Sequence, residues 1–315
     1  MDEIQVPVYL IMGFLESGKT SFLQEIFDNG EFIDGEPGLL ICCEDGEVSM
    51  KKQSLVLCRT QQVFLEEEEE LTSEFFQKCQ DKYQPGRVFI EYNGMWNPET
   101  LFDTDLPDGW GIYQIITIID ASTFSLYLSN MRSLVGNMLK YTELAVFNRC
   151  TEDLDLPSFR RNAKALNNEI QIMFEHRDGH MIELGRDIPP YDLNAPVIEI
   201  QDEDFGIWYL DASDDRDRYE GKTVRFKGRI MKGRFPKEYF VPGRKAMTCC
   251  ADDIQFIGFL CRSGNIAVPK PGEWVTVTAR MQYEYRREYR GIGPVLLAED
   301  VQPAERPADE LVYFN

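Results

Sequence analysis

The stretch that begins at Gly13 and reads GFLESGKT carries the residues with the clearest chemistry. Its second glycine opens the run Gly18-Lys19-Thr20, so the two glycines have the spacing of a phosphate-binding loop. Glycines let the backbone turn its N–H groups toward phosphate oxygens. Lys19 would bridge the β- and γ-phosphates of a nucleoside triphosphate, and the Thr20 hydroxyl would ligate magnesium. The spacing therefore predicts a magnesium–nucleotide site.

An acidic group is expected beside such a loop, either to hold magnesium through water or to orient the attacking water. Glu91 lies at the carboxyl end of the apolar run 87–93, RVFIEYN, and is followed by Gly94. Ligands of open α/β sheets bind at that edge of the sheet. The alternative is a strand-end glutamate that faces solvent, and we favour the site.

The segment 42–47, CCEDGE, follows another apolar run and offers three more carboxylates, Glu44, Asp45 and Glu47. They could reach magnesium or a transferred metal ion, and they could equally form an ordinary polar turn. Either Glu91 or a carboxylate of this segment would position the attacking water. The candidate catalytic residues are Glu91 and Glu47.

The elements around these residues alternate between strand and helix. The apolar run 6–12 precedes the loop as a buried parallel strand would, and 21–30 follows it as a helix. This alternation predicts a P-loop NTPase fold of the α/β class, with a mostly parallel sheet covered on both faces. Further strands are expected at 38–43, 54–58, 87–93, 113–120, 143–148 and 169–174, and helices at 72–83, capped by Thr72, and 122–140.

The composition changes near RDIPPYDLNAP, residues 186–196, which has the character of a linker. Beyond it, short runs alternate apolar and polar residues, which favours a small β-barrel of the oligonucleotide/oligosaccharide-binding (OB) type. These runs are 222–231, 254–261, 273–285 and 293–303. The predicted regions are a P-loop domain at 1–190, a linker at 191–204, a β-rich OB-like domain at 205–305 and a tail at 306–315.

The chain has 315 residues, of which 54 are acidic and 33 basic, giving a formal charge of −21. Such a surface repels phosphate backbones and disfavours general nucleic-acid binding. The opening MDEIQVPVYLIMG is acidic where a signal peptide is basic, and no apolar run approaches the roughly 20 residues of a membrane span. Eight cysteines are too few for a disulfide scaffold. We therefore expect a cytoplasmic protein with no membrane span.

Five segments, GFLESGKT, CCEDGEVSM, IEYNGMWNPETL, IIDASTF and AVFNR, fall in the order and spacing of the CobW-type P-loop GTPases. Over roughly residues 5–175 the chain resembles this family, whose relatives are the hydrogenase and urease maturation GTPases. The resemblance implies GTP hydrolysis coupled to metal insertion or trafficking. The residues that match the family's nucleotide site are Gly13, Gly18, Lys19, Thr20, Glu91 and Asn148. We predict nucleotide contacts from Gly13, Glu16, Ser17, Gly18, Lys19, Thr20, Ser21, Asn148 and Arg149, and magnesium contacts from Thr20 and Glu91.

The first departure from the family is Glu16, because members usually carry a small residue there. Its carboxylate could lie near the phosphates and weaken their binding, or reach magnesium or another metal beside the nucleotide. We favour a third interpretation, in which the side chain turns to solvent.

The second departure lies in the guanine-reading motif Asn-Lys-x-Asp, which is NRCT from Asn148 to Thr151 here. Arg149 can still stack over a base. Thr151 cannot accept the two hydrogen bonds that guanine donates to the aspartate, which weakens the preference for guanine. Glu152 or Asp153 could substitute if the loop shifts. GTP remains the expected nucleotide, with ATP as the alternative.

The third departure is the missing Cys-x-Cys-Cys metal motif, since the corresponding interval holds only Cys58 and Cys79. Another tentative site for zinc or a different transition metal consists of Cys249, Cys250 and Cys261, which lie near two aspartates. The alternative for these thiols is burial as small apolar groups, and it is favoured.

The two histidines of the chain, His176 and His180, have i, i+4 spacing in the segment EHRDGH. Gly179 within that segment predicts a turn, so we do not predict a histidine metal site there.

The region from about 205 to 303 resembles a second family, the C-terminal β-rich domain of bacterial proteins often found with putative permeases. This resemblance implies no established activity and suggests a small ligand or metal. The region also holds a basic patch, which could bind single-stranded nucleic acid or form a solvated strand face. The second alternative is favoured by the net charge. The patch consists of Arg225, Lys227, Arg229, Lys232, Arg234 and Lys237.

The function predicted from the sequence is binding and slow hydrolysis of GTP, coupled to metal or ligand trafficking. The expected partners are the nucleotide, magnesium, and a metal ion or a client metalloprotein. One alternative is a nucleotide-dependent adaptor or switch without catalysis, and another is a barrel that binds single-stranded nucleic acid.

Overall fold

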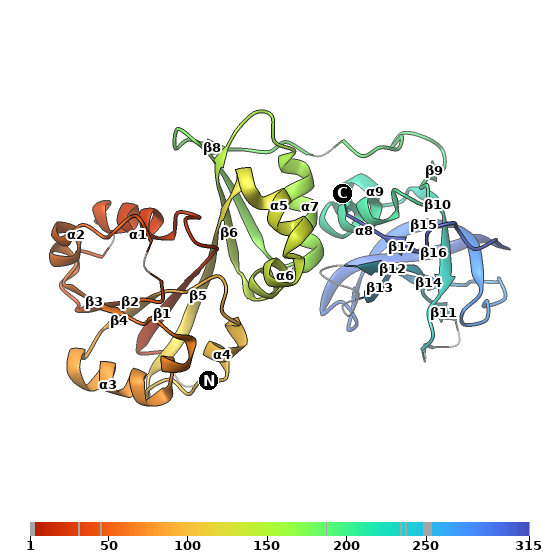
Figure 1. The fold of residues 1–315 in the computed structure, drawn as a ribbon. Coiled ribbons are helices and arrows are strands. Elements are labelled where there is room, and N and C mark those ends of the chain that lie inside the picture. The colour runs from red at the N-terminus through yellow and green to blue at the C-terminus, as the bar shows by residue number, and fades with distance from the viewer. Residues whose placement is uncertain are drawn as a thin grey trace. The chain divides into compact units, whose positions relative to one another are not determined.

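The computed structural model describes residues 4–30, 32–44, 46–186, 188–233, 235–236, 238–247 and 254–314. The chain divides into two compact units, Met1–Glu183 and Leu184–Asn315. In Figure 1 the first unit runs from red to green and consists of a sheet with helices against it. The second unit, from green to blue, is rich in strands.

The first unit is built on a single sheet, which confirms the predicted α/β fold with mostly parallel strands. Its strands are β1 (Val6–Met12), β2 (Gly38–Cys42), β3 (Thr60–Phe64), β4 (Arg87–Glu91), β5 (Trp110–Asp120), β6 (Leu144–Cys150), β7 (Gln171–His176) and β8 (Met181–Ile182). The strand order is β3-β2-β4-β1-β5-β6-β7-β8. The pairs are parallel except for β7 with β8. The carboxyl ends of β1, β4, β5 and β6 therefore meet at one edge.

Helices cover the sheet, and α3, α4, α5 and α7 begin at capping side chains. They are α1 (Lys19–Asp28), α2 (Lys52–Leu57), α3 (Ser73–Tyr83), α4 (Pro98–Phe102), α5 (Ala121–Asn130), α6 (Arg132–Tyr141) and α7 (Leu156–Leu166), with a short 3-10 turn at Glu68–Glu70. The predicted N-cap of α3 is confirmed, since the Thr72 hydroxyl accepts from the Phe75 N–H at 3.2 Å. Asp120 caps α5 by accepting from the Ser122 N–H at 2.9 Å.

The strand predicted at 54–58 is wrong, because residues 52–57 form α2 and the third strand is β3. An apolar run as short as SLVLC does not distinguish a strand from a helix. Contacts with α1 favour the helix, since the Ser54 hydroxyl donates to Asp28 at 2.6 Å and accepts from Gln24 Nε2 at 2.6 Å.

The single helix predicted at 122–140 is also wrong, because the segment consists of α5 and α6. Met131 lies between them with φ −132° and ψ 37°, outside the helical region. The Asn130 side chain donates to the Leu126 carbonyl at 2.8 Å. Such a local side-chain bond competes with continued helical hydrogen bonding at the end of α5.

The apolar residues of β1 alternate between the two faces of the sheet, as side chains on a strand must. Val8 and Leu10 join a buried cluster on one face. Ile11 joins the cluster on the other face, together with Leu23 and Phe27 of α1. Burial on both sides therefore fixes the position of the loop that follows β1.

The second unit is a β-rich half-barrel. Its elements are β9 (Ile198–Glu199), α8 (Phe205–Asp214), α9 (Arg216–Tyr219), β10 (Thr223–Ile230), β11 (Tyr239–Phe240), β12 (Pro242–Met247), β13 (Ile254–Gly258), β14 (Leu260–Arg262), β15 (Trp274–Arg286), β16 (Gly291–Pro303) and β17 (Leu311–Val312). The strand order is β11-β14-β16-β15-β10-β12-β13, with β17 on β12 and β9 on β10. The OB-like arrangement stays a prediction.

Several elements of the second unit have no counterpart in the sequence prediction. The region 191–204, predicted as a linker, contributes β9, in which Ile198 is the partner of Val224 on β10. The helix α8 carries Trp208, which is fully buried against Phe226 and Phe259. In the described part of the chain, no helix is both long enough and apolar enough to cross a membrane.

Candidate nucleotide site

The loop from Gly13 to Gly18 joins β1 to α1, and its backbone requires glycine at both ends. Gly13 has φ +143°, and a Cβ there would lie 2.3 Å from the Ile118 carbonyl oxygen. Gly18 has φ +103°, and a Cβ there would lie 2.7 Å from Asn148 Nδ2. Gly94, just beyond β4, is equally restricted, since its Cβ would lie 2.4 Å from the Gly13 carbonyl oxygen. The loop is thus closely surrounded by backbone.

Lys19 begins α1 and is almost completely buried, with 1% of its side chain exposed. Its ammonium donates to the carbonyl oxygens of Gly13 at 2.7 Å and Phe14 at 2.9 Å, and forms an ion pair with Glu44. The second carboxylate oxygen of Glu44 is buried and has no hydrogen-bond partner in the described part of the chain. A carboxylate therefore lies beside the lysine that would hold a phosphate.

Thr20 and Glu91 meet at the N-terminus of α1, where the Thr20 hydroxyl donates to Glu91 Oε1 at 2.5 Å. Burial raises the pKa of Glu91, while the Thr20 hydrogen bond and the nearby Lys19 ammonium act in the opposite direction. The Cys42 thiol donates to the other oxygen of Glu91 at 3.6 Å and accepts from Gln62 Nε2 at 3.2 Å. The glutamate is thus held by groups from α1 and β2.

These groups surround a pocket of about 170 Å³, which we call the phosphate pocket. It is lined by Glu16, Gly18, Lys19, Thr20, Ser21, Glu44, Gly46, Glu47, Val48, Glu91 and Arg149. Most of the predicted nucleotide contacts and both predicted catalytic glutamates therefore lie together. Asp45, the remaining carboxylate of CCEDGE, lies outside the described residues.

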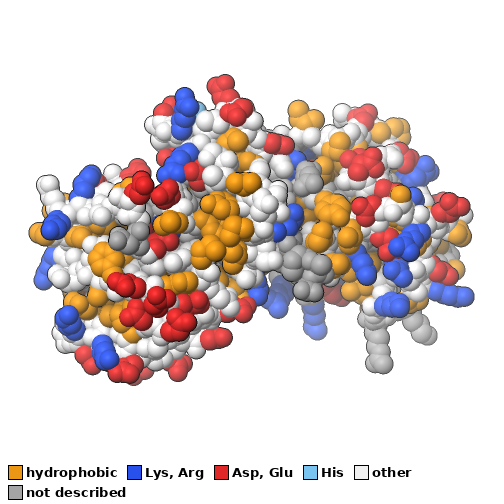
Figure 2. All heavy atoms as spheres, viewed as in Figure 1, with side chains coloured by type: hydrophobic (Ala, Val, Ile, Leu, Met, Phe, Trp, Pro, Cys, Tyr) orange, Lys and Arg blue, Asp and Glu red, His pale blue; other side chains and the backbone are white. Residues whose placement is uncertain are grey.

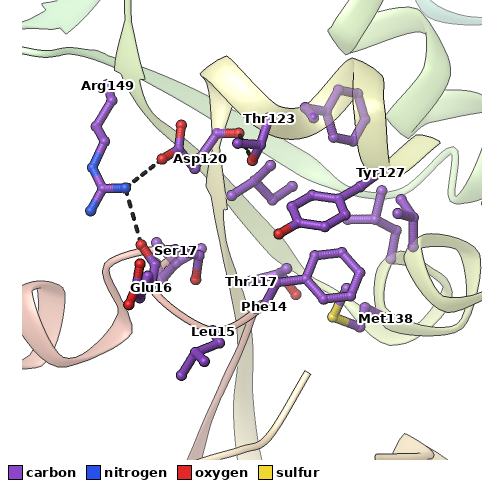
Figure 3. A pocket seen from close by; sticks show the side chains of 16 residues that line it. Phe14, Leu15, Glu16, Ser17, Thr117, Asp120, Thr123, Tyr127, Met138 and Arg149 are labelled. Atoms are coloured by element: carbon purple, nitrogen blue, oxygen red, sulfur yellow. Dashed lines mark hydrogen bonds and ion pairs between the residues drawn. The ribbon is translucent and has the colours of Figure 1, made fainter. Parts of the chain in front are cut away.

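The end of β6 lies over the loop. The Asn148 side chain donates to the Ser17 carbonyl at 2.7 Å. Arg149, with φ +54°, donates to the Glu16 carbonyl at 3.0 Å and forms an ion pair with Asp120 (Figure 3). No role was predicted for Asp120, although it ends a strand beside the one that carries Asn148. The sequence signal that could have identified Asp120 is its place at the carboxyl end of the apolar run 113–120, and the structure pairs it with Asn148.

Several buried polar atoms near the loop have no hydrogen-bond partner among the described residues, and such atoms indicate whether the site suits a polar ligand. In the described part of the chain these atoms include Ser17 Oγ, Asn148 Oδ1 and Glu44 Oε2. Such atoms are costly unless something binds them. Together with Lys19 and the hydroxyl of Thr20, they fit a nucleotide with magnesium.

Comparison with protein-family models decides the family. Residues 7–174 match the model described as CobW/HypB/UreG, nucleotide-binding domain. The chain belongs to the CobW/HypB/UreG family. The C-terminal part, residues 183–314, matches the model of the DUF1980 C-terminal domain. The family consists of P-loop GTPases.

Solved structures of two such GTPases are similar to this chain. One is the hydrogenase maturation factor HypB from Archaeoglobus fulgidus, with 14% identity over 55% of this chain and 83% of that chain and a TM-score of 0.40. The other is the Zn(II)-bound YjiA GTPase from E. coli, with 17% identity over 74% of each chain and a TM-score of 0.43. A triple mutant of YjiA, also Zn(II)-bound, has 16% identity, the same coverage and a TM-score of 0.43. No curated protein matched the sequence.

The guanine-reading motif differs here at two positions, with Arg149 in place of lysine and Thr151 in place of the final aspartate. The Thr151 hydroxyl hydrogen-bonds the Asp153 carboxylate and keeps the pKa of that carboxyl below its ordinary value. A carboxylate is therefore close to the position where the family motif has aspartate. Glu16 is exposed, with φ +61°, and also lines the phosphate pocket, so its orientation toward solvent stays a prediction.

A second pocket of about 150 Å³ lies on the other side of Arg149. Figure 3 shows it between the loop and α5, with the rings of Phe14 and Tyr127 facing each other. Their centroids are 4.3 Å apart. Met138 contributes further apolar surface, and Glu16 and Arg149 line both pockets. This pocket suits a flat or apolar group next to the phosphate pocket.

Of the remaining predicted metal ligands, Cys261 alone lies within the described residues. Cys249 and Cys250 lie outside the described residues, as do the two aspartates near them. Cys261 is completely buried on β14, and burial raises the pKa of its thiol. Cys58 and Cys79 are also buried and free. Burial as small apolar groups accounts for these three thiols.

Two residues of the basic patch of the second unit, Arg225 and Lys227, form ion pairs. Arg225 pairs with Glu199 at 2.9 Å, and Lys227 pairs with Asp202 at 3.0 Å. Arg234 and Lys237 lie outside the described residues. On the visible face of this unit, basic and acidic side chains are interspersed, whereas acidic ones gather on the first unit (Figure 2). This distribution offers little to a nucleic-acid backbone.

Proposed function

We propose that the first unit binds magnesium and GTP and hydrolyses the GTP slowly. The observation that carries this proposal is the convergence of Lys19, Thr20 and Glu91 in one pocket at the N-terminus of α1. A lysine, a hydroxyl and a buried carboxylate are the groups that phosphoryl transfer uses for charge and orientation. Membership of the CobW/HypB/UreG family supports the same reaction.

Phosphate binding would begin with an exchange of partners at Lys19. Its ammonium leaves Glu44 and binds phosphate oxygens, while the loop N–H groups and the N-terminus of α1 supply further donors. The Lys19–Glu44 ion pair is buried, since only 9% of the Glu44 side chain is exposed. Because this pair must be broken, part of the free energy of nucleotide binding is lost in the exchange. The competition between Glu44 and phosphate for Lys19 supports a modest affinity for the nucleotide.

Thr20 and Glu91 would hold the magnesium ion. Bound magnesium supplies positive charge that neutralises the phosphate oxygens. Glu47, which lines the phosphate pocket, positions the attacking water with or without help from Glu91. The water forms a new bond to the γ-phosphorus as the bond to the β-phosphate oxygen breaks, releasing GDP and phosphate. Glu47 is exposed, so it orients the water loosely, which supports slow turnover.

Base recognition is proposed to involve Asn148, Arg149 and Asp153. Asn148 fixes the loop, Arg149 stacks over the base, and Asp153 accepts hydrogen bonds in place of the family's aspartate. ATP is the alternative nucleotide, because Asp153 is an exposed group whose contact with a base depends on the loop around it.

The biological role proposed is nucleotide-dependent trafficking of a metal or ligand, with the second unit presenting or receiving the cargo or a client metalloprotein. Two alternatives remain. The Lys19–Glu44 ion pair favours an adaptor that binds nucleotide without turnover, because it competes with phosphate. Binding of single-stranded nucleic acid by the second unit is disfavoured by its paired basic residues. The cytoplasmic location stays a prediction.

Phosphate release from GTP and from ATP, measured with magnesium, tests this function. Lys19→Ala should abolish turnover, whereas Lys51→Ala, which removes an exposed lysine of the same unit, should not. Turnover that survives Lys19→Ala would contradict the proposal. Binding of a fluorescent GTP analogue without any lysine-dependent turnover would support the adaptor instead.

A further inference from the structure

The hairpin that joins β7 to β8 brings both histidines of the chain together. The predicted turn is present, with Gly179 at φ +92° and its N–H donating to the His176 carbonyl at 2.8 Å. The His176 N–H donates to the His180 carbonyl at 2.8 Å. From the sequence alone, this turn argued against a metal site shared by the two histidines. In the structure, the turn is what places the two imidazoles side by side.

Asp178 at the tip of the hairpin lies against both rings. Its Oδ1 atom is 2.9 Å from His176 Nδ1 and 2.5 Å from His180 Nδ1. The rings stack with centroids 4.6 Å apart at an interplanar angle of 27°. One potential ligand atom from each residue lies within 4.8 Å of the other two.

We propose that His176, Asp178 and His180 form a binding site for a divalent transition metal ion such as zinc. Zinc binds imidazole nitrogen and carboxylate oxygen at about 2.0–2.2 Å, so two ligands of a tetrahedral ion lie about 3.3 Å apart. The nitrogen–oxygen distances in the hairpin are slightly shorter than this. A small separation of the side chains would admit an ion without a change in the backbone.

The ligand types select the class of metal. Two imidazoles and one carboxylate suit zinc, copper, nickel or cobalt, whereas magnesium and calcium prefer oxygen ligands. The proposed site therefore differs in chemistry from the magnesium site beside Thr20.

The exposure of the three side chains suits reversible binding of the metal ion. The exposed fractions are 22% for His176, 61% for Asp178 and 62% for His180. Three protein ligands leave a coordination position for water or for a donor group of another molecule. The backbone hydrogen bonds of the hairpin pre-organise the ligands, which lowers the entropic cost of binding.

The test follows from the histidine content, because these two imidazoles are the only ones in the chain. Full-length protein with the tag removed is labelled with ¹⁵N-histidine and titrated with zinc. Both sets of imidazole resonances should change together and saturate. Imidazole resonances that stay unchanged in excess zinc, while zinc binds elsewhere or not at all, would overturn the proposal.

Variants give the affinity change, measured by competition with a chromophoric chelator. His180→Gln and Asp178→Asn should each weaken zinc binding by about tenfold or more. Because zinc could also bind thiolates, each is made in a background carrying Cys249→Ser and Cys250→Ser. Circular dichroism and thermal unfolding show that the variants are folded. Unchanged zinc affinity in folded His180→Gln would also overturn the proposal.

A matched pair of glycine variants tests the role of the turn. Gly179 and Gly35 both have positive φ, +92° and +88°, and a Cβ at either meets nothing within 4 Å. Alanine is therefore strained at both positions for the same reason. Gly179→Ala should weaken zinc binding severalfold and Gly35→Ala should leave it unchanged. Equal zinc affinity in the two variants would contradict pre-organisation by the turn.

Discussion

The two ends of the proposed nucleotide site are constructed differently. At the phosphate end, backbone geometry dominates, because Gly13 and Gly18 have no room for a side chain and Lys19 is 1% exposed. At the base end, side chains dominate, and Arg149 is 48% exposed while Asp153 lies in solvent. The backbone end has little tolerance for substitution, and the side-chain end has more.

This difference explains how the chain keeps the phosphate loop of its family and still departs from the guanine motif. A change in an exposed side chain at the base end alters a few hydrogen bonds. A change at the phosphate end displaces backbone or leaves buried groups without partners. Variants at the two ends should therefore affect GTP and ATP in different ways.

The largest effect is expected from Glu91→Gln at the phosphate end. Loss of the carboxylate removes a magnesium ligand, so kcat should fall about 100-fold or more with GTP and ATP alike. Steady-state phosphate release with each nucleotide measures this. A fall limited to one nucleotide would contradict the assignment of Glu91 to the phosphate end.

Glu91→Gln lowers kcat, but it should stabilise the fold of the nucleotide-free chain. Burial raises the pKa of Glu91, so the stability gained from its neutral form is present at low pH and is lost as pH rises through the raised pKa. Glu91→Gln should therefore raise the unfolding temperature at mildly alkaline pH and leave it nearly unchanged at acidic pH. Thermal unfolding at both pH values measures this, and destabilisation at alkaline pH would contradict it.

An intermediate effect is expected from Glu44→Gln. Removing the charge weakens the competition for Lys19, so GTP and ATP should each bind about tenfold more tightly, in line with one charge-assisted hydrogen bond. Glu47→Gln is the control, because it removes a carboxylate from the same pocket without touching that ion pair. Titration calorimetry without turnover would show the difference, and weaker binding by Glu44→Gln would mean that Glu44 helps to hold the ligand.

The smallest effect is expected from Asp153→Asn at the base end. Its loss should reduce GTP affinity by severalfold and leave ATP affinity unchanged, because adenine does not offer the same donors to a carboxylate. Asp155→Asn, which replaces the cap of α7 nearby, controls for a general loosening of the loop. An equal loss for both nucleotides would place Asp153 outside base recognition.

The sequence predicted what depends on local pattern. The buried run before Gly13, the helix after Lys19 and the place of Glu91 at a strand end all follow from periodicity and motif spacing. The two mistaken elements, 54–58 and 122–140, were decided by a contact with α1 and by the backbone at Met131. The short apolar run 54–58 does not distinguish strand from helix, and the helical pattern of 122–140 does not show the break at Met131.

The sequence did not predict contacts between distant segments. The ion pairs of Lys19 with Glu44 and of Arg149 with Asp120 depend on how parallel strands align at one edge. The hairpin of His176 and His180 was recognised as a turn, but the direction of its side chains was not. The fold class can therefore be predicted from the sequence. The ion-pair partners of charged residues can be identified only once the alignment of the strands in the sheet is known.

The most direct test of the account is calorimetric titration of GTP with magnesium into the wild-type chain, Lys19→Ala and Glu44→Gln. The account predicts binding to the wild type, tighter binding to Glu44→Gln and none to Lys19→Ala. Equal binding to all three, or no binding of GTP or ATP to the wild type and Glu44→Gln, would contradict the central claim that the phosphate pocket holds a nucleotide.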